Sequence, residues 1–262
     1  MQTIGTDARY DCLIVERHAD VVTITMNLPE RRNALSLDHL RELLDAFTRA
    51  GASDALGVIL AANGPVFSAG HDFADMAGND LAAMRALLQT CTDVMTMMQQ
   101  IPQPVVARVH GLATAAGCQL VASADLAVAA SDAAFAVPGG KGGWFCTTPL
   151  VALGRNVGRK RALEMAMTGD PIDAATAAEW GLVNRVVLPD ELHRSTDDLL
   201  ARATRGSALS KGIGKQAFYA QIDLDQAKAY AYAVEVMAAA SQTDDAREGV
   251  AAFLEKRAPR FR

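Results

Sequence analysis

The chain has 262 residues, of which 50% are hydrophobic and 21% are charged, and its formal net charge is −5. A chain of this length and apolar content can bury a sizeable core, which excludes intrinsic disorder as its resting state. Its basic residues are scattered along the sequence, so no electrostatic footprint for a nucleic-acid partner is present.

The first part of the chain predicts a hairpin, a helix and a strand. Short apolar, β-branched runs at 12–15 and 21–26 flank a polar tetrapeptide, a pattern typical of a β-hairpin. Residues 38–50 carry apolar side chains at helical spacing, and Ser36 stands where an N-cap is expected. The apolar run 57–60 predicts a buried strand.

The middle of the chain repeats the order strand, small-residue turn and helix. Residues 80–100 predict a long amphipathic helix that two prolines end, and 105–109 predict the next strand. A buried helix over 117–124 and a strand over 126–129 follow. This order indicates an α/β architecture, although periodicity alone does not separate a doubly wound sheet from a spiral.

The last part of the chain is helical. After 187–190 the sequence offers three helix candidates, at 210–219, 224–240 and 245–257. No low-complexity linker precedes them, so a fully independent second domain is not indicated. We therefore expect a core over residues 1–205 followed by a helical region over 206–262.

The cysteines and the N-terminus bear on the compartment. The cysteines are far apart and show no C-x-x-C spacing, which argues against a disulfide framework or a structural zinc site. Residues 1–7 lack the basic start and apolar core of a signal peptide, and no apolar stretch is long enough to cross a bilayer. We expect a soluble, cytoplasmic protein with no membrane partner.

Two corners of small residues are the most informative feature of the sequence. The stretches 66–76 and 110–120 each follow a short apolar run and lead into a helical one. Small residues at such corners let a ligand approach the backbone, and the first helical N–H groups have no internal partner. Two facing corners would aim two amides at one point, as in an oxyanion hole. The alternative is that both are only tight packing spots between strand and helix.

These corners resemble a known family. The pairing of F-S-A-G-H-D at 67–72 with G-L-A-T-A-A-G-C-Q-L at 111–120 resembles the crotonase superfamily, also called enoyl-CoA hydratase/isomerase. Further matches are R-R-N-A-L-S at 31–36, T-G-D-P-I through G-L-V at 168–183, and F-L-E-K-R at 253–257. The resemblance covers nearly the whole chain, with its signatures in the family's order.

The resemblance implies a fold, a substrate class and an assembly. The fold is α/β, a crotonase-like spiral of ββα turns with a C-terminal helical trimerisation region, so a homotrimer or a dimer of trimers is expected. The substrate is an acyl-CoA thioester, and no cofactor is permanently bound. Lyase or isomerase activity in fatty acid metabolism follows from the same resemblance.

The family pattern also implies site residues. The backbone amides of His71 and Ala116 take the oxyanion-hole positions, and the second lies at a helix N-terminus whose dipole favours negative charge. For the basic residues among the CoA contacts, a solvated surface position is the competing interpretation. Ala74 stands where the family often has a lysine. The implied contacts to CoA are Arg31, Arg32, Ala34, Ala69, Gly70, Asp72, Phe73, Ala74 and Lys256.

The departures from the family concern acid and base. Hydratases use two glutamates that share one water, and the matching positions here are Gln119 and Gly139. Neither side chain can transfer a proton at neutral pH, so the two-glutamate route is not expected. Cys146 and Thr147 are further candidates, although a buried, inert cysteine is the commoner outcome.

The role of the His71 side chain stays open, because only its amide is required. The five histidines form no ligand-spaced cluster, so no metal is expected. Within the superfamily, the run 111–123 together with F-C-T-T-P at 145–149 resembles the enoyl-CoA hydratase domain-containing protein 3 group, which likewise lacks the glutamate pair.

Three functions remain in view. The first is an acyl-CoA-binding family member with an intact oxyanion hole and an altered acid/base pair. The second is a non-catalytic acyl-CoA sensor or scaffold. The third is a thioester decarboxylase or hydrolase that uses His71 or Cys146. Whether the protein is an enzyme is left open by the sequence.

Overall fold

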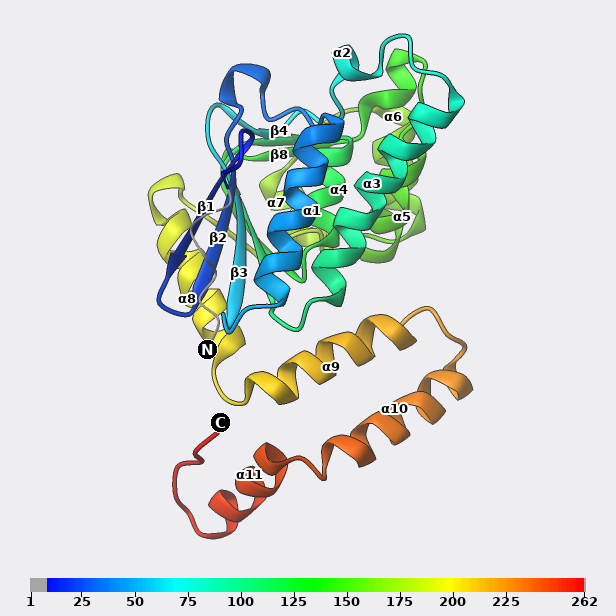
Figure 1. Ribbon diagram of the computed structural model, residues 1–262. Helices are drawn as coiled ribbons and strands as arrows, with labels where there is room; N and C mark the ends of the chain where they lie inside the picture. The colour runs from blue at the N-terminus through cyan, green and yellow to red at the C-terminus, as the bar shows by residue number, and fades with distance from the viewer. Residues whose placement is uncertain (1–8, 262) are drawn as a thin grey trace.

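Two β-sheets form the centre of the computed structural model, which describes residues 9–261 (Figure 1). One sheet has six strands in the order β1 (Leu13–His18), β2 (Val21–Met26), β3 (Gly57–Ala62), β5 (Val105–Val109), β7 (Leu126–Ala130) and β10 (Arg185–Val187). The other has four strands in the order β4 (Val66–Ser68), β6 (Leu112–Thr114), β8 (Ala134–Ala136) and β9 (Ile172–Asp173). Residues 1–7, which the sequence analysis finds to lack the features of a signal peptide, lie outside the described residues.

The chain winds between the two sheets as a spiral. A strand of the larger sheet is followed by a short strand of the smaller sheet and then by helix, as in β3, β4, α2 (Phe73–Met76) and α3 (Leu81–Gln100). The next turn is β5, β6 and α4 (Ala116–Ser123), and another begins with β7 and β8. Successive turns pair their strands in parallel. The expected spiral of ββα turns is therefore confirmed.

The predicted helix starts are set by side-chain caps. Helix α1 (Leu37–Gly51) begins after Ser36, whose Oγ accepts the His39 N–H at 3.2 Å. Helix α3 begins after Asp80, whose carboxylate accepts the Ala83 N–H at 2.8 Å. The hairpin, both helices and the strand β5 lie within a few residues of their predicted bounds.

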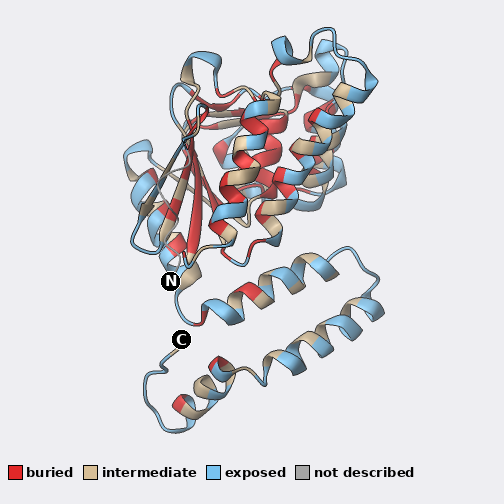
Figure 2. Ribbon diagram, in the orientation of Figure 1, coloured by how far each residue is buried: buried red, intermediate tan, exposed pale blue. Residues whose placement is uncertain are grey.

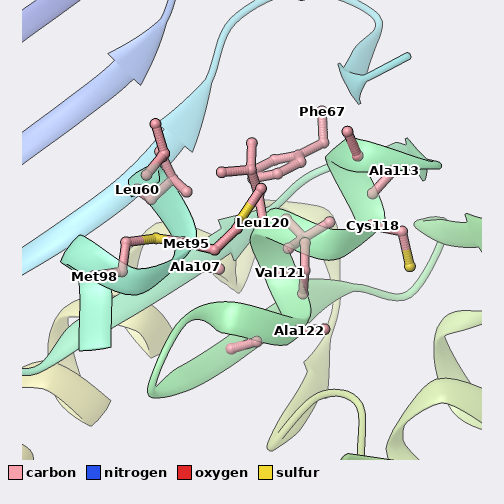
Figure 3. Close-up of a cluster of buried hydrophobic side chains, with 14 of the residues drawn as sticks. Leu60, Phe67, Met95, Met98, Ala107, Ala113, Cys118, Leu120, Val121 and Ala122 are labelled. Carbon is pink, nitrogen blue, oxygen red and sulfur yellow. The ribbon is translucent and has the colours of Figure 1, made fainter. Parts of the chain in front are cut away.

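The core lies between the larger sheet and the helices α1, α3 and α4 (Figure 2). All residues of α4 are buried, so this helix is held on every side. Figure 3 shows its Leu120 beside Met95 of α3 and Leu60 of β3. On the opposite side of the sheet, α8 (Leu192–Thr204) packs over a smaller apolar cluster that includes Val106.

The remaining helices complete the smaller sheet and form an arm. Helix α7 (Ala174–Trp180) packs against the smaller sheet, α5 (Thr147–Asn156) packs against α4, and α6 (Arg159–Thr168) packs against α5. Short 3₁₀ turns lie at Pro29–Arg31, Pro138–Gly142 and Pro189–Glu191. Figure 1 shows the arm beside the core, made of α9 (Ala208–Gln221), α10 (Gln226–Ala240) and α11 (Asp244–Leu254). The expected boundary at 205/206 falls between α8 and α9. Among the described helices, none is long and apolar enough to span a membrane.

Candidate functional site

The first corner connects β4 to α2 and is strapped down by the loop at 31–36. The Ala69 N–H donates to the Arg32 carbonyl at 3.0 Å, and the Leu35 N–H donates to the Gly70 carbonyl at 2.8 Å. Ser68 adds a buried bridge, because its hydroxyl donates to the Asn33 carbonyl at 2.8 Å and accepts the Gly70 N–H at 3.2 Å. These bonds fix the direction of the backbone that follows.

The second corner connects β6 to α4 through a strained residue. Ala115 has φ 49° and ψ −117°, which is unusual for a residue with a Cβ, and it provides no side-chain cap for the helix. Its own N–H donates to the Ala136 carbonyl of β8 at 2.9 Å, which holds the corner in place. The Ala116 amide is thus presented at an uncapped helix N-terminus.

Two glycines let these corners approach each other. At Gly70, which has φ +83°, an added Cβ would lie 2.9 Å from the Ala115 Cβ and 3.3 Å from the Ala116 nitrogen. At Gly117 an added Cβ would lie 2.6 Å from the Ser68 carbonyl oxygen. The backbones of the corners are therefore in contact. Within residues 9–261, neither the His71 amide nor the Ala116 amide donates to another protein group.

A cavity of about 390 Å³ opens beside the two corners, and it is a size that suits a small-molecule ligand. The corners contribute Ala69, His71 and Ala116 to its wall, and the segment 138–149 forms most of the rest. No side chain of Asp, Glu, Lys or Arg belongs to this lining as far as the structure describes the chain. The cavity thus favours an uncharged group.

The His71 imidazole faces this cavity. Its ring centroid lies 6.3 Å from that of Trp144, which also lines the cavity. Both ring nitrogens are buried, and neither has a hydrogen-bond partner in the described part of the chain. Burial lowers the pKa of His71 and outweighs a contact with the Leu35 backbone that opposes the shift, so the ring is neutral at pH 7 and can both accept and donate a hydrogen bond.

Of the two positions that the family resemblance matches to the hydratase glutamates, the structure brings only Gly139 to the cavity. Gly139 lines it, and its N–H donates to the Cys146 Sγ at 3.3 Å. An added Cβ at Gly139 would lie 2.2 Å from the Trp144 carbonyl oxygen and 2.6 Å from the Cys146 Sγ. Gln119 is 4% exposed within α4, is absent from the cavity lining, and its Oε1 has no partner among residues 9–261.

The further candidates Cys146 and Thr147 both line the cavity. Cys146 is buried, and burial raises the pKa of its thiol while the Gly139 N–H opposes the shift. The protonated thiol is a poor nucleophile. The Thr147 hydroxyl donates to the Phe145 carbonyl at 3.3 Å.

The residues expected to meet CoA surround the first corner. Arg31 forms an ion pair with Asp72, whose carboxylate also accepts the Ala74 N–H at 2.9 Å and so caps α2. The Ala34 carbonyl contacts the His39 Nδ1 at 3.0 Å. The side chains that remain open to solvent here are those of Arg31, Arg32, Ala69, Phe73 and Ala74.

Within one copy of the chain, the expected CoA contact Lys256 lies far from the site. It follows α11 at the end of the arm, whereas α2 lies at the far side of the core (Figure 1). Its predicted role therefore depends on assembly and stays a prediction. Conversely, the sequence patterns did not single out Leu88 or Trp144 as lining residues, because no local signal distinguishes them from core or surface residues.

Similar proteins are found among both sequences and structures. The chain is 44% identical over 240 residues to a Mus musculus protein named enoyl-CoA hydratase domain-containing protein 3, mitochondrial. The aligned region covers 90% of this chain and 79% of the mouse protein. A crystal structure of Mycobacterium smegmatis enoyl-CoA hydratase matches with a TM-score of 0.92 and 46% identity, covering 95% of this chain and 98% of that one. The human enoyl-CoA hydratase domain-containing protein 3 structure matches with a TM-score of 0.91 and 40% identity, covering 95% and 99%.

The expected cytoplasmic location is wrong on this comparison, because the mouse relative is named as mitochondrial. Relatives from rat, zebrafish and human carry the same name. The error has a physical origin. Free cysteines indicate a reducing environment, which does not single out one compartment.

The family itself is shown by the match along the chain. The model of the enoyl-CoA hydratase/isomerase family matches residues 16–262, which includes both corners and the helical arm. With the spiral of ββα turns and the two apposed corners, the chain belongs to the enoyl-CoA hydratase/isomerase family of the crotonase superfamily.

Proposed function

We propose that this protein binds acyl-CoA thioesters, with the thioester carbonyl oxygen held by the amides of His71 and Ala116. The observation that carries the proposal is the close approach of Gly70 to Ala115 and Ala116. It is supported by the uncharged cavity beside both amides, which suits an acyl chain. Two fixed donors at that oxygen would stabilise the negative charge of an enolate.

The proposed chemistry is not ordinary hydration. A hydratase must move protons at two carbons, and Gln119 and Gly139 cannot do this. We expect lyase or isomerase chemistry on fatty acyl thioesters to depend on the oxyanion hole, with crotonyl-CoA hydration close to background. A protein that binds acyl-CoA but turns over no thioester would be a sensor or scaffold.

Calorimetry with acetyl-CoA and longer acyl-CoAs tests the binding claim. The variant Gly70→Ala places a Cβ between the corners, and we expect it to weaken binding about tenfold, the value of one lost hydrogen bond. Gly78→Ala is the matched control, because Gly78 also has a positive φ (+81°) but no atom within 4 Å of the added Cβ. Absence of binding heat with every acyl-CoA for the wild-type protein would reject the proposal.

A second candidate function is thioester decarboxylation through the His71 imidazole. It is favoured by two buried ring nitrogens without partners in a cavity that contains no charged side chain. The raised pKa of Cys146 disfavours thioester hydrolysis through that thiol. His71→Ala keeps the backbone amide, so loss of malonyl-CoA decarboxylation with retained acyl-CoA binding would support this function. Equal rates for both proteins would dismiss it.

A further inference from the structure

A second cavity of about 800 Å³ lies on the outer face of the larger sheet. Its lining residues come mainly from the β1–β2 hairpin and α8. Helix α8 lies on the opposite side of the larger sheet from α1 (Figure 1). We call it the β1–α8 groove, defined by Glu16 and Thr23 of the hairpin, Ile59 of β3, Arg108 of β5, and His193 and Leu200 of α8. It shares no lining residue with the acyl cavity.

Arg108 is the unusual residue of this groove. It projects from β5, is only partly accessible, and burial lowers the pKa of its guanidinium while Asp197 opposes that shift. Within residues 9–261 the guanidinium has no ion pair within 4.0 Å and no hydrogen bond, and the carboxylate that acts on it from a longer distance is that of Asp197. Partly burying a cation that makes no direct hydrogen bond or contact ion pair costs free energy, and such a group calls for an explanation.

Two imidazoles stand next to Arg108. His110 comes two residues after Arg108, directly after the end of β5, and its Nε2 donates to the Gly64 carbonyl at 2.8 Å. His193 lies across the groove on α8, one turn before Asp197. Burial, together with the nearby Arg108 guanidinium, lowers the pKa of His193. This end of the groove therefore gathers several hydrogen-bond donors.

The other carboxylates of the groove lie away from Arg108. Glu16 is on β1, three strands from β5 in the sheet order, which separates the two backbones by about 14 Å. Asp20 lies in the turn of the hairpin, at the opposite end of the strands. Between the ends, the floor and wall are apolar or uncharged at Thr23, Ile59 and Leu200.

We propose that the β1–α8 groove binds a small amphiphile bearing a carboxylate or phosphate. The anionic group meets Arg108 and His193, and the apolar body lies over Ile59 and Leu200. The guanidinium offers a fork of donors that matches either anion. The site is independent of the acyl-CoA proposal, because the two cavities lie at different places in the fold.

The site is tested by adding ligand to histidine-labelled protein and observing which histidines respond. The chain has five histidines, so each imidazole can be assigned and followed by nuclear magnetic resonance. The probes are octanoate, octyl phosphate and inorganic phosphate, which separate the two anions from the apolar contribution. We expect both amphiphiles to shift His193 and His110 at concentrations where inorganic phosphate has a smaller effect. Movement of His71 alone would place the probes in the acyl cavity and overturn the proposal.

Two substitutions sharpen the test. Arg108→Gln is expected to weaken octanoate binding about tenfold or more, whereas Arg194→Gln, on α8 but outside the lining, leaves it unchanged. Asp197 is exposed, so Asp197→Asn preserves the fold and is expected to strengthen binding by removing a competing carboxylate. If Arg108→Gln does not fold, the Asp197 variant decides: unchanged or weaker binding contradicts the proposal.

Discussion

At the scale of single residues, Gly139 explains why the hydratase chemistry cannot simply be restored. The space that a side chain would need there is filled by the Trp144 carbonyl and the Cys146 Sγ. The other position matched to a hydratase glutamate, Gln119, is buried and does not belong to the cavity lining. The packing around both positions therefore leaves no room for a pair of glutamates that reach the cavity.

We predict that the double variant Gln119→Glu with Gly139→Glu gains no hydratase activity. The new side chain at 139 must displace the 144–146 backbone, and a carboxylate at 119 would be buried without a partner, which destabilises the fold by roughly 2 kcal/mol or more. The measurements are the loss of crotonyl-CoA absorbance and urea unfolding. Gly142→Glu is the control, because Gly142 lines the same cavity with open space around it. A hundredfold gain in hydration by the double variant would contradict this account.

At the scale of elements, a buried polar cluster contributes to the attachment of α9 to the core. Lys215 of α9 donates to the Met98 and Gln103 carbonyls, each at 2.7 Å, and pairs with Asp125 at 2.6 Å. The Asp125 carboxylate also accepts the Tyr219 hydroxyl at 2.9 Å. The side chains of Lys215 and Asp125 are only 10% and 14% exposed. All three donors of the ammonium are therefore used where little water is present.

Breaking this cluster from one side should loosen α9. We predict that Asp125→Asn lowers the free energy of unfolding by about 3 kcal/mol, because the Lys215 charge stays buried without its counterion. Hydrogen exchange should show loss of amide protection in α9 before the sheet. The exposed pair Arg41–Asp38 is the control, and Asp38→Asn should cost less than about 1 kcal/mol. An equal loss of unfolding free energy in Asp125→Asn and Asp38→Asn would contradict this interpretation.

At the scale of the whole molecule, sequence patterns predicted the elements better than their relative placement. The hairpin, α1 and α3 follow from local periodicity and from caps such as Ser36 and Asp80. The two corners could be predicted because only small residues allow their backbones to come this close to each other. The absence of Gln119 from the cavity lining could not be predicted. All residues of its helix are buried, so the sequence shows no polar face that would indicate which side of the helix meets the cavity.

The helical arm carries an exposed apolar face on α10. On α10, Tyr230, Val234 and Met237 are 66%, 59% and 80% exposed, and their spacing puts them on one face of the helix. A contiguous exposed apolar face of this kind marks an interaction surface. We propose that a second copy of this chain covers it, consistent with the expected homotrimer.

We predict that Val234→Glu with Met237→Glu reduces the mass measured by light scattering toward that of one chain. Two carboxylates in an apolar interface would have to be desolvated without partners, and this cost opposes association. Ala239→Glu is the matched control, because Ala239 is exposed on the opposite face of α10 and its variant should keep the wild-type mass. The core does not pack on this face, so circular dichroism of the double variant should stay that of a folded protein. A wild-type protein that is already monomeric, or a double variant with unchanged mass, would show that this face of the arm is not the interface.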